Sequence, residues 1–388
     1  MPGFEIINKS ELKQIEKIFK YGKGVLFRHG FEKLRNKSYQ VKKFEENFAK
    51  KFNSKFSLAV SSGTAALRIA LASLGIKKGD EVITQSFTFV ATVEAIVESG
   101  AKPICTEIDD TLNMCPKSLK SKITNKTKAV ILVHMLGSPG NVSIIKKICK
   151  EKKIHLIEDT AWGLGAKYKK NFLGTIGDIG TFSFDFAKTL TTGEGGMILF
   201  KYKKHYLKAK AWHDHGHENN PNVPRWEDTR SSSGFNFRLT ELQGAVGIIQ
   251  LKKFNQIFTQ HKKNKNIILK KIKNIPELKF RYIPKNATDA SESLIFSFAN
   301  KHLANNFRKT FLENGYSTKI LPEAISWHFA GQWKHIKELD LKKDFFFKKS
   351  LKNLEKFVSI QIFYKMDKKY PDIIEKTIKK VLWKNRYQ

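Results

Sequence analysis

Residues 181–197 read TFSFDFAKTLTTGEGGM, and this stretch decides both the fold and the chemistry of the chain. The alternation of Phe182, Ser183 and Phe184 predicts the end of a strand whose apolar side chains face a core. A glycine cluster at 193–196 then allows a tight backbone return before a second apolar run at 197–200. Lys188 lies between these two runs, where desolvation lowers the pKa of an amine and frees it to attack a carbonyl. Taken alone, the pattern also fits a surface lysine in a lysine-rich chain.

The composition limits the class of protein. The chain has 388 residues, with 71 Lys and Arg against 36 Asp and Glu, so its formal net charge is +35. Such a charge suits a nucleic-acid binder, but the lysines are spread along the chain without zinc-finger spacing or a compact recognition helix. We therefore expect no specific nucleic acid as a partner, and an anionic substrate explains the charge better.

The start of the chain and its cysteines indicate the compartment. The first residues lack the apolar core of a signal peptide, and no apolar run approaches the roughly 18 residues of a membrane span. Three cysteines without a CxxC pair, Cys105, Cys115 and Cys149, are typical of reduced thiols. We expect a cytoplasmic protein without a membrane span.

From about residue 57, short apolar runs alternate with helical stretches, which predicts an α/β fold with a mostly parallel sheet covered on both faces. Strands are predicted at 58–60, 81–83, 103–105, 129–133, 155–157, 181–184 and 196–200. Helices fit between them at 64–74, 90–98 and 144–151. A strong helical segment after residue 239 leads to a lysine-rich region of mixed pattern. We expect a helical N-terminal segment with a large domain at 1–255, and a smaller C-terminal α+β domain at 256–388.

The segment SSGTAAL at 61–67 follows a predicted strand and opens a helix. Gly63 permits a ligand to approach the backbone closely, while the hydroxyl of Thr64 and the free N–H groups of the first helical turn attract an anion. The segment is neither a Walker loop nor a GxGxxG motif. A plain helix N-cap is the alternative explanation of its hydroxyl groups.

Two other strand ends carry candidate residues. Asp159, in IEDTAW, is placed to pair with a cationic ring nitrogen, and a helix N-cap is again the alternative. Phe89, in QSFTFVAT, offers an aromatic ring at a strand-to-helix junction, where stacking on a flat cofactor competes with core packing.

Together these pieces follow one order along the chain: the cradle near 63, then Phe89, Asp159, Ser183 and Lys188. The set resembles the DegT/DnrJ/EryC1/StrS family of sugar aminotransferases, and the resemblance runs from FEENFAKKF at 44–52 to GFNFRLTELQGAVGIIQL at 234–251. It implies the type I (aspartate aminotransferase) fold and pyridoxal 5′-phosphate as the cofactor. It also implies that Lys188 is the catalytic lysine that bonds covalently to this cofactor.

The resemblance assigns further roles by position. Gly63, Thr64 and Ser183 would bind the phosphate, Phe89 would stack on the ring, and Asp159 would pair with the ring nitrogen.

Three more residues receive roles at the subunit boundary and the substrate. Asn236, in GFNFR, matches a residue that reaches the cofactor of a neighbouring subunit, which implies a homodimer with shared active sites. Arg238 beside it and His328 in SWHFAGQW would contact the substrate, with a purely structural role for His328 as the alternative.

One position departs from the family pattern. Many members carry His or Gln three residues after the aspartate, in contact with the cofactor, and this chain has Trp162 there. The sequence around this residue is similar to that of a subgroup that includes the 8-amino-3,8-dideoxy-manno-octulosonate transaminases. His213, His215 and His217 alternate as metal ligands can, but no further ligand accompanies them, so we expect a polar loop and no metal.

The predicted function is transfer of an amino group from L-glutamate to a keto or aldehyde sugar for surface polysaccharide or lipopolysaccharide synthesis, with the octulosonate as the leading acceptor. A nucleotide-linked 3- or 4-keto sugar is the alternative acceptor. A sugar 3-dehydratase of the same fold would carry histidine in place of Lys188, which argues against that reaction. A nucleic-acid-binding protein is the remaining alternative.

Overall fold

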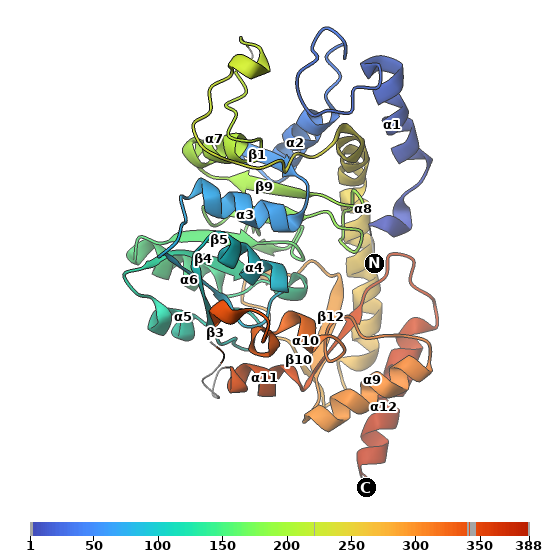
Figure 1. Ribbon diagram of the computed structural model, residues 1–388. Coiled ribbons are helices and arrows are strands. Elements are labelled where there is room, and N and C mark those ends of the chain that lie inside the picture. The colour runs from blue at the N-terminus through green and yellow to red at the C-terminus, as the bar shows by residue number, and fades with distance from the viewer. Residues whose placement is uncertain (1–2, 221, 340, 342–346, 387–388) are drawn as a thin grey trace.

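A central sheet organises the protein, whose computed structural model describes residues 3–220, 222–339, 341 and 347–386 (Figure 1). Its strand order is β1-β9-β8-β5-β4-β2-β3, with β9 antiparallel to both neighbours and every other pair parallel. The strands are β1 Phe56–Val60, β2 Glu81–Gln85, β3 Lys102–Thr106, β4 Thr127–Val133, β5 His155–Asp159, β8 Ile179–Ser183 and β9 Gly196–Phe200. The predicted α/β fold with a mostly parallel sheet is confirmed, and each predicted strand is present.

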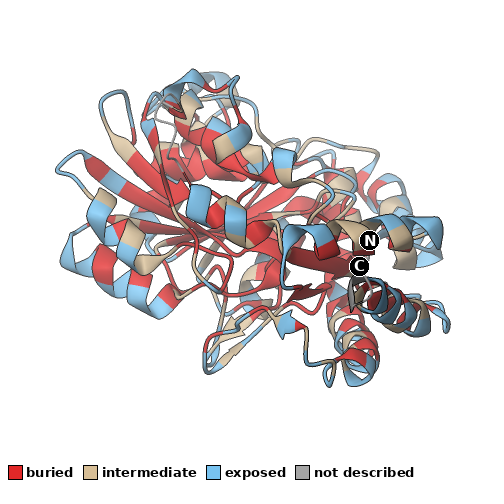
Figure 2. Cartoon of the chain, turned by 90° about the horizontal axis from the view of Figure 1, so that it is seen from below, coloured by how far each residue is buried: buried red, intermediate tan, exposed pale blue. Residues whose placement is uncertain are grey.

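Alternation along the strands supplies two cores, one on each face of the sheet. In β4, Ala129 and Ile131 join the core beneath one layer of helices, whereas Val130 and Leu132 join the core on the opposite side. Figure 2 shows these buried residues along the sheet, with exposed residues on the outer faces of the helices. The covering helices are α3 Gly63–Ser73, α4 Val90–Glu98, α5 Pro116–Lys122, α6 Val142–Glu151 and α7 Lys203–Trp212.

Helix α8 (Glu241–Ile272) is the long helix predicted after residue 239, and it extends from the sheet toward the C-terminal part (Figure 1). The N-terminal helices α1 (Lys9–Gly22) and α2 (Gln40–Lys51) pack against it. The contact with α2 depends on glycine, because a Cβ on Gly247 would lie 2.7 Å from the ring of Phe44.

The C-terminal part has its own sheet and its own apolar core, which Phe296 and Phe307 help to form. This sheet has the order β10-β12-β13. The helices and strands of the C-terminal part are β10 Lys279–Phe280, β12 Ser293–Ser297, α9 Lys301–Glu313, α10 Ile325–His328, α11 Lys348–Leu354, β13 Phe357–Gln361 and α12 Tyr370–Arg386. The predicted boundary between 255 and 256 falls within the continuous helix α8, and this division into domains stays a prediction.

A third sheet was not anticipated from the sequence. It joins β6 (Lys167–Tyr168), β7 (Asn171–Phe172) and β11 (Ala287–Thr288), strands of two residues each. Strands this short leave no periodic pattern for a sequence to reveal.

In the described part of the chain, none of the helices combines the length and apolar character needed to cross a bilayer.

Candidate active site

Four predicted site segments leave the sheet at one edge. They follow the carboxyl ends of β1, β2, β5 and β8, which all run in the same direction. Ligands of open α/β sheets bind at this edge, because the loops that leave parallel strands converge there. The topology therefore brings together residues that are far apart in the sequence.

An anion cradle lies where β1 gives way to α3. Ser62 caps the helix by accepting the backbone N–H of Ala65 at 3.0 Å. Gly63 faces Ser183 so closely that a Cβ on Gly63 would lie 2.8 Å from the Ser183 Cβ. Thr64 is exposed beside them. Free N–H groups at the start of this helix, together with its dipole, favour a bound anion between the two strand ends.

Asp159 ends β5 and is buried, with both carboxylate oxygens held. Its Oδ2 accepts the hydroxyl of Thr92 at 3.1 Å, and its Oδ1 accepts the backbone N–H of Ala161 at 3.1 Å. Burial raises the pKa of this carboxyl, while the two hydrogen bonds and the charge of Lys188 oppose the rise. The carboxylate is thus fixed in direction and able to receive a cationic group. Thr92 was not predicted, although its place one turn into the helix after Phe89 could have suggested it.

Lys188 lies in the loop after β8, with its Nζ 3.4 Å from the ring centroid of Trp162. Burial lowers the pKa of this lysine to about 8, although the carboxylates of Glu292, Asp185 and Asp159 oppose the shift. An amine with a pKa near 8 has a much larger neutral, nucleophilic fraction at physiological pH than an ordinary lysine, although most of it is still protonated. The structure thus brings Lys188 into contact with Trp162 and close enough to Asp159 for their charges to interact, while the roles of these residues stay predictions.

Two charged residues of the C-terminal part complete this cluster, and the sequence did not reveal them. Lys319 places its Nζ 4.6 Å from the Trp162 ring centroid and 3.2 Å from Glu292 Oε1. Glu292 is buried, and its second oxygen accepts the hydroxyl of Thr189 at 3.4 Å. Trp162 is thus in contact with two lysines, and the carboxylate of Glu292 offsets part of their charge. The signal available in the sequence was a lone glutamate next to the apolar strand β12.

Phe89 and His328 face each other beside the site. Their ring centroids are 5.5 Å apart, and the backbone N–H of Thr88 donates to the carbonyl of His328 at 2.9 Å. Phe89 is 43% exposed and so keeps a free ring surface. Burial lowers the pKa of His328, and the charge of Lys188 lowers it further, which keeps this imidazole neutral.

Asn236 and Arg238 lie along the end of β1, next to the anion cradle. Arg238 pairs with Val60 in a short bridge, and Asn236 is exposed. The guanidinium of Arg238 binds the carboxylate of Asp214 and lies 4.9 Å from the ring of Phe27. Arg238 is thus engaged within its own chain, and its predicted contact with substrate stays a prediction.

The three alternating histidines have different surroundings. His213 is buried and its Nδ1 contacts the carbonyl of Lys210, whereas His217 contacts the carboxylate of Asp228 at 3.2 Å. His215 is exposed. Within the described ranges, no cluster of three or more His, Cys, Asp or Glu side chains could hold a metal ion.

The residues present fit pyridoxal phosphate. Gly63 lies so close to Ser183 that no Cβ fits between them, and this close approach brings the N–H groups of the first turn of α3 and the Ser183 hydroxyl to one place, where they suit a phosphate group. A buried carboxylate at Asp159 suits a protonated ring nitrogen, and Lys188 has an amine that burial has made nucleophilic.

Known proteins are similar to this chain in sequence. Residues 31–379 match the model of the DegT/DnrJ/EryC1/StrS aminotransferase family. A GDP-perosamine synthase of Escherichia coli O157:H7 is 37% identical over 63% of this chain, and the match spans only 66% of that relative. A GDP-4-keto-6-deoxy-D-mannose 3-dehydratase of Escherichia coli O55:H7 is 33% identical over 72% of this chain and 76% of its own length.

Solved structures agree on the fold over almost the whole chain. An aminotransferase of Psychrobacter cryohalolentis superimposes with a TM-score of 0.85 at 24% identity, covering 98% of both chains. The NtdA protein of Bacillus subtilis, solved with the cofactor PMP, superimposes with a TM-score of 0.83 at 21% identity, covering 97% of this chain and 83% of its own. The predicted type I fold is confirmed.

Proposed function

Because the chain belongs to the DegT/DnrJ/EryC1/StrS aminotransferase family, we propose that it transfers an amino group from L-glutamate to a keto sugar carried on a nucleotide, with pyridoxal phosphate as the cofactor. The observation that carries this proposal is the amine of Lys188, whose pKa burial lowers and which lies against Trp162, in the loop that follows Ser183.

The proposed roles follow from the geometry of the site. The first turn of α3, with Gly63, Thr64 and Ser183, would bind the phosphate group. Asp159 would accept a hydrogen bond from the ring nitrogen, because Thr92 and the Ala161 N–H fix its carboxylate.

Two aromatic residues bound the cofactor region. Phe89 would cover one face of the ring, since its own ring is partly exposed. Trp162 would border Lys188, which it contacts here.

Bound pyridoxal phosphate supplies a carbonyl for the amines and a ring that withdraws electrons from the bond being broken. Lys188 supplies the proton chemistry: its neutral Nζ takes a proton at the Cα of the amino donor and returns a proton during amination of the sugar. A pKa near the working pH suits an amine that must both accept and release protons.

The family relatives favour the nucleotide-linked acceptor over the octulosonate that leads the sequence-based prediction. One relative is named for GDP-perosamine and another for a GDP-linked 4-keto sugar. A nucleoside diphosphate also suits a chain of net charge +35, because a positive field raises the encounter rate with anions.

Dehydration of the sugar is the second candidate reaction, because the relative that matches 72% of this chain is a 3-dehydratase. Lysine at position 188 argues for amination, since the dehydratases that the sequence resembles carry histidine there. The two reactions give products of different mass from the same substrate. GDP-4-keto-6-deoxy-D-mannose with glutamate would give an amino sugar in the first case and a deoxygenated keto sugar in the second.

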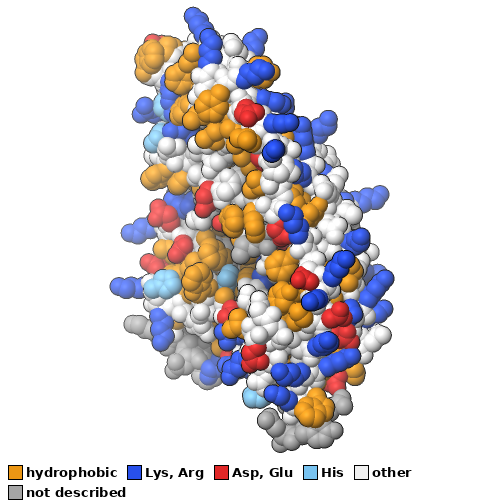
Figure 3. Space-filling view, turned by 90° about the vertical axis from the view of Figure 1, so that its right-hand side faces the viewer, with side chains coloured by type: hydrophobic (Ala, Val, Ile, Leu, Met, Phe, Trp, Pro, Cys, Tyr) orange, Lys and Arg blue, Asp and Glu red, His pale blue; other side chains and the backbone are white. Residues whose placement is uncertain are grey.

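A homodimer with shared active sites is part of the proposal. Large hydrophobic side chains are exposed in the first 34 residues, at Phe4, Ile7, Leu12, Phe19, Tyr21, Leu26, Phe31 and Leu34. Figure 3 shows hydrophobic groups gathered among lysines on the face that carries the N-terminal part. Exposed apolar surface of this kind is typical of subunit interfaces. A monomer by light scattering at micromolar concentration would contradict this part of the proposal.

The cofactor assay tests the proposal directly. The apoprotein is incubated with pyridoxal phosphate, its absorbance is recorded, and glutamate is then added. We expect a visible band from covalently bound cofactor that disappears on adding glutamate. Lys188→Ala should lack the band, whereas Lys146→Ala, at an exposed position of α6, should keep it. A colourless wild-type protein would overturn the proposal.

A further inference from the structure

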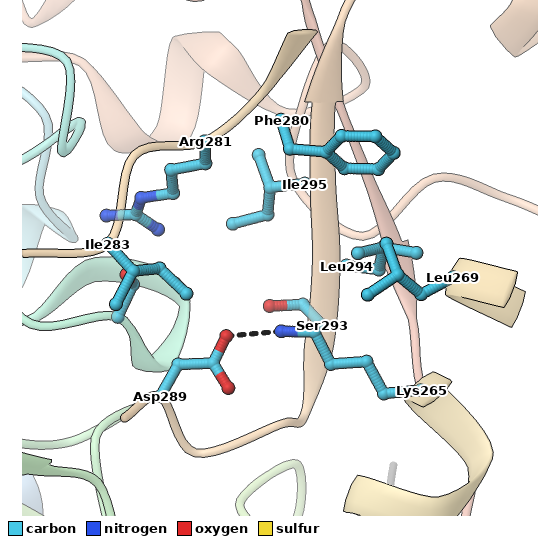
Figure 4. Close-up of a pocket in the computed structure, with 10 residues that line it drawn as sticks. Lys265, Leu269, Phe280, Arg281, Ile283, Asp289, Ser293, Leu294 and Ile295 are labelled. Atoms are coloured by element: carbon cyan, nitrogen blue, oxygen red, sulfur yellow. Dashed lines mark hydrogen bonds and ion pairs between the residues drawn. The ribbon is translucent and has the colours of Figure 1, made fainter. Parts of the chain in front are cut away.

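A cavity of about 270 Å³ lies between α8, the segment 280–283 and the beginning of β12 (Figure 4). None of its lining residues belongs to the candidate active site. Most of the wall is apolar and comes from Leu269, Phe280, Ile283, Leu294 and Ile295. The cavity is therefore a separate feature that the proposed reaction does not use.

Arg281 gives this apolar cavity a buried cation. The residue is only 7% exposed, and its Nε and Nη1 donate to the carbonyls of Thr111 and Met135 at 2.6 and 2.7 Å. Its Nη2 has no hydrogen-bond partner. Burial lowers the pKa of the guanidinium, and the carboxylates of Asp289 and Asp109 oppose this effect. A buried donor of a charged group that lacks a partner is costly, which indicates a missing acceptor.

A second unused donor lines the same cavity. Ser138 is 2% exposed, and its hydroxyl has no hydrogen-bond partner. At the opposite side, the ammonium of Lys265 is bound to the carboxylate of Asp289, as the dashed line in Figure 4 shows. Among the lining residues, Arg281 and Lys265 thus outnumber the single carboxylate, and an anion would balance the difference.

We propose that this cavity binds a small carboxylate, whose oxygens accept hydrogen bonds from Arg281 and Ser138 and whose short apolar chain packs against Leu269, Phe280 and Ile295. The volume is just below the roughly 300 to 1,000 Å³ of pockets that hold drug-sized ligands, which fits a molecule of few heavy atoms. A carboxylate satisfies both unused donors at once, whereas an alcohol or an amine leaves the charge of Arg281 unbalanced.

The cavity has an entrance that can be tested without disturbing the core. Ile283 lines it and is 37% exposed, so a glutamate at this position would add a negative charge at the rim. Ile267, on α8, is 39% exposed and does not line this cavity, so it offers a matched control.

Calorimetric titration of the full-length protein with sodium hexanoate tests the site, with 1-hexanol as the uncharged probe. We expect saturable binding of hexanoate and none of hexanol. Ile283→Glu should abolish the binding of hexanoate, whereas Ile267→Glu should preserve it. Ser138→Ala should weaken it about tenfold, the loss expected for one hydrogen bond to a charged group.

The control for the serine variant is Ser297→Ala, on the same strand as the cavity residues Leu294 and Ile295, because Ser297 donates to the carbonyl of Lys279 instead. Three outcomes would overturn the proposal: no saturable binding of hexanoate, equal binding of hexanol, or equal affinity in the two glutamate variants. Either of the first two would mean that the cavity holds only water or apolar solutes, and the third would mean that hexanoate binds outside this cavity.

Discussion

At the scale of single residues, the reactivity of Lys188 is set by burial and by a small group of charges. Burial lowers its pKa to about 8, the carboxylate of Glu292 raises it, and the ammonium of Lys319 lowers it. Glu292 and Lys319 form an ion pair, and Lys319 also lies over the Trp162 ring, so each charge limits the effect of the other.

Substitutions in this pair should move the pKa of Lys188 in opposite directions. Glu292→Gln removes a charge that stabilises the ammonium, so the pKa should fall. Lys319→Met removes a charge that repels the ammonium, so the pKa should rise. Because only the neutral amine attacks, the rate at which the apoprotein captures pyridoxal phosphate should increase with pH, with a midpoint near 8 in the wild type. Identical midpoints in all three proteins would contradict this coupling.

Gly63 should tolerate no side chain. In Gly63→Ala, the new Cβ would lie 2.8 Å from the Cβ of Ser183 and would push Ser183 away from the first turn of α3, where the phosphate is proposed to bind. Overpacking of this kind costs about 1–3 kcal/mol, so the affinity for pyridoxal phosphate should fall roughly 5- to 150-fold. Titration of the apoprotein measures the effect. Gly22→Ala, at the end of α1, is the control and should bind the cofactor as the wild type does; unchanged affinity in Gly63→Ala would show that no anion sits there.

Most of these residues could be predicted from the sequence, and the reason is physical. Gly63 and Lys188 each come soon after a strand and Asp159 ends one, so the strand pattern itself locates them at one edge of the sheet. Glu292 and Lys319 were missed because they come from the C-terminal part, and nothing in their local sequence indicates that they meet Trp162.

At the scale of elements, the N-terminal segment supports the loop that carries Lys188. The backbone N–H of Gly3 donates to the carbonyl of Lys188 at 3.1 Å. Phe4 stacks on Phe186 with ring centroids 4.6 Å apart. The carboxylate of Glu5 accepts the backbone N–H of Lys365 at 2.8 Å, so the same segment also contacts the C-terminal part.

Removal of the Phe4 ring should loosen the lysine loop. An aromatic pair contributes about 0.5–1.5 kcal/mol, so amide hydrogen exchange at 185–191 should become roughly two- to tenfold faster in Phe4→Ala. Phe19→Ala, at an exposed position of α1, should leave this loop unchanged. Exchange that is equally slow in both variants would mean that the segment does not hold the loop.

The positions of the strands in the sequence were the most predictable feature of the fold. Each strand of the central sheet has an apolar run bounded by polar residues or glycine, so its period is visible. The pairing of the strands could not be predicted in the same way. The antiparallel placement of β9 between β1 and β8 depends on contacts between segments that are far apart in the chain. The long helix after residue 239 was predicted, and α8 runs without interruption through residue 255 while it packs against α1 and α2.

At the scale of the whole molecule, the charge of +35 should act on the rate of substrate capture. A nucleoside diphosphate sugar is attracted to a positive surface, and salt screens this attraction over about 10 Å at 0.1 M ionic strength. We therefore expect kcat/KM for the nucleotide sugar to fall as salt rises, while the absorbance band of the bound cofactor stays constant. A kcat/KM that is independent of salt would assign the charge no role in capture.

The composition predicts an anionic partner only as a class, because net charge does not distinguish one phosphate ester from another, and the charge of the substrate stays a prediction. Localisation in the cytoplasm and the homodimer also stay predictions, because both depend on surroundings that a single chain does not contain.

Transfer of nitrogen is the most direct test of the central claim that Lys188 makes this protein an aminotransferase. The protein, loaded with pyridoxal phosphate, is incubated with ¹⁵N-glutamate and GDP-4-keto-6-deoxy-D-mannose, and with an oxidised octulosonate in parallel, and the products are analysed by mass spectrometry. We predict a ¹⁵N-labelled amino sugar from the GDP-linked substrate with the wild type, and none with Lys188→Ala. A product that has lost oxygen without gaining ¹⁵N, or label that appears equally with Lys188→Ala, would contradict it.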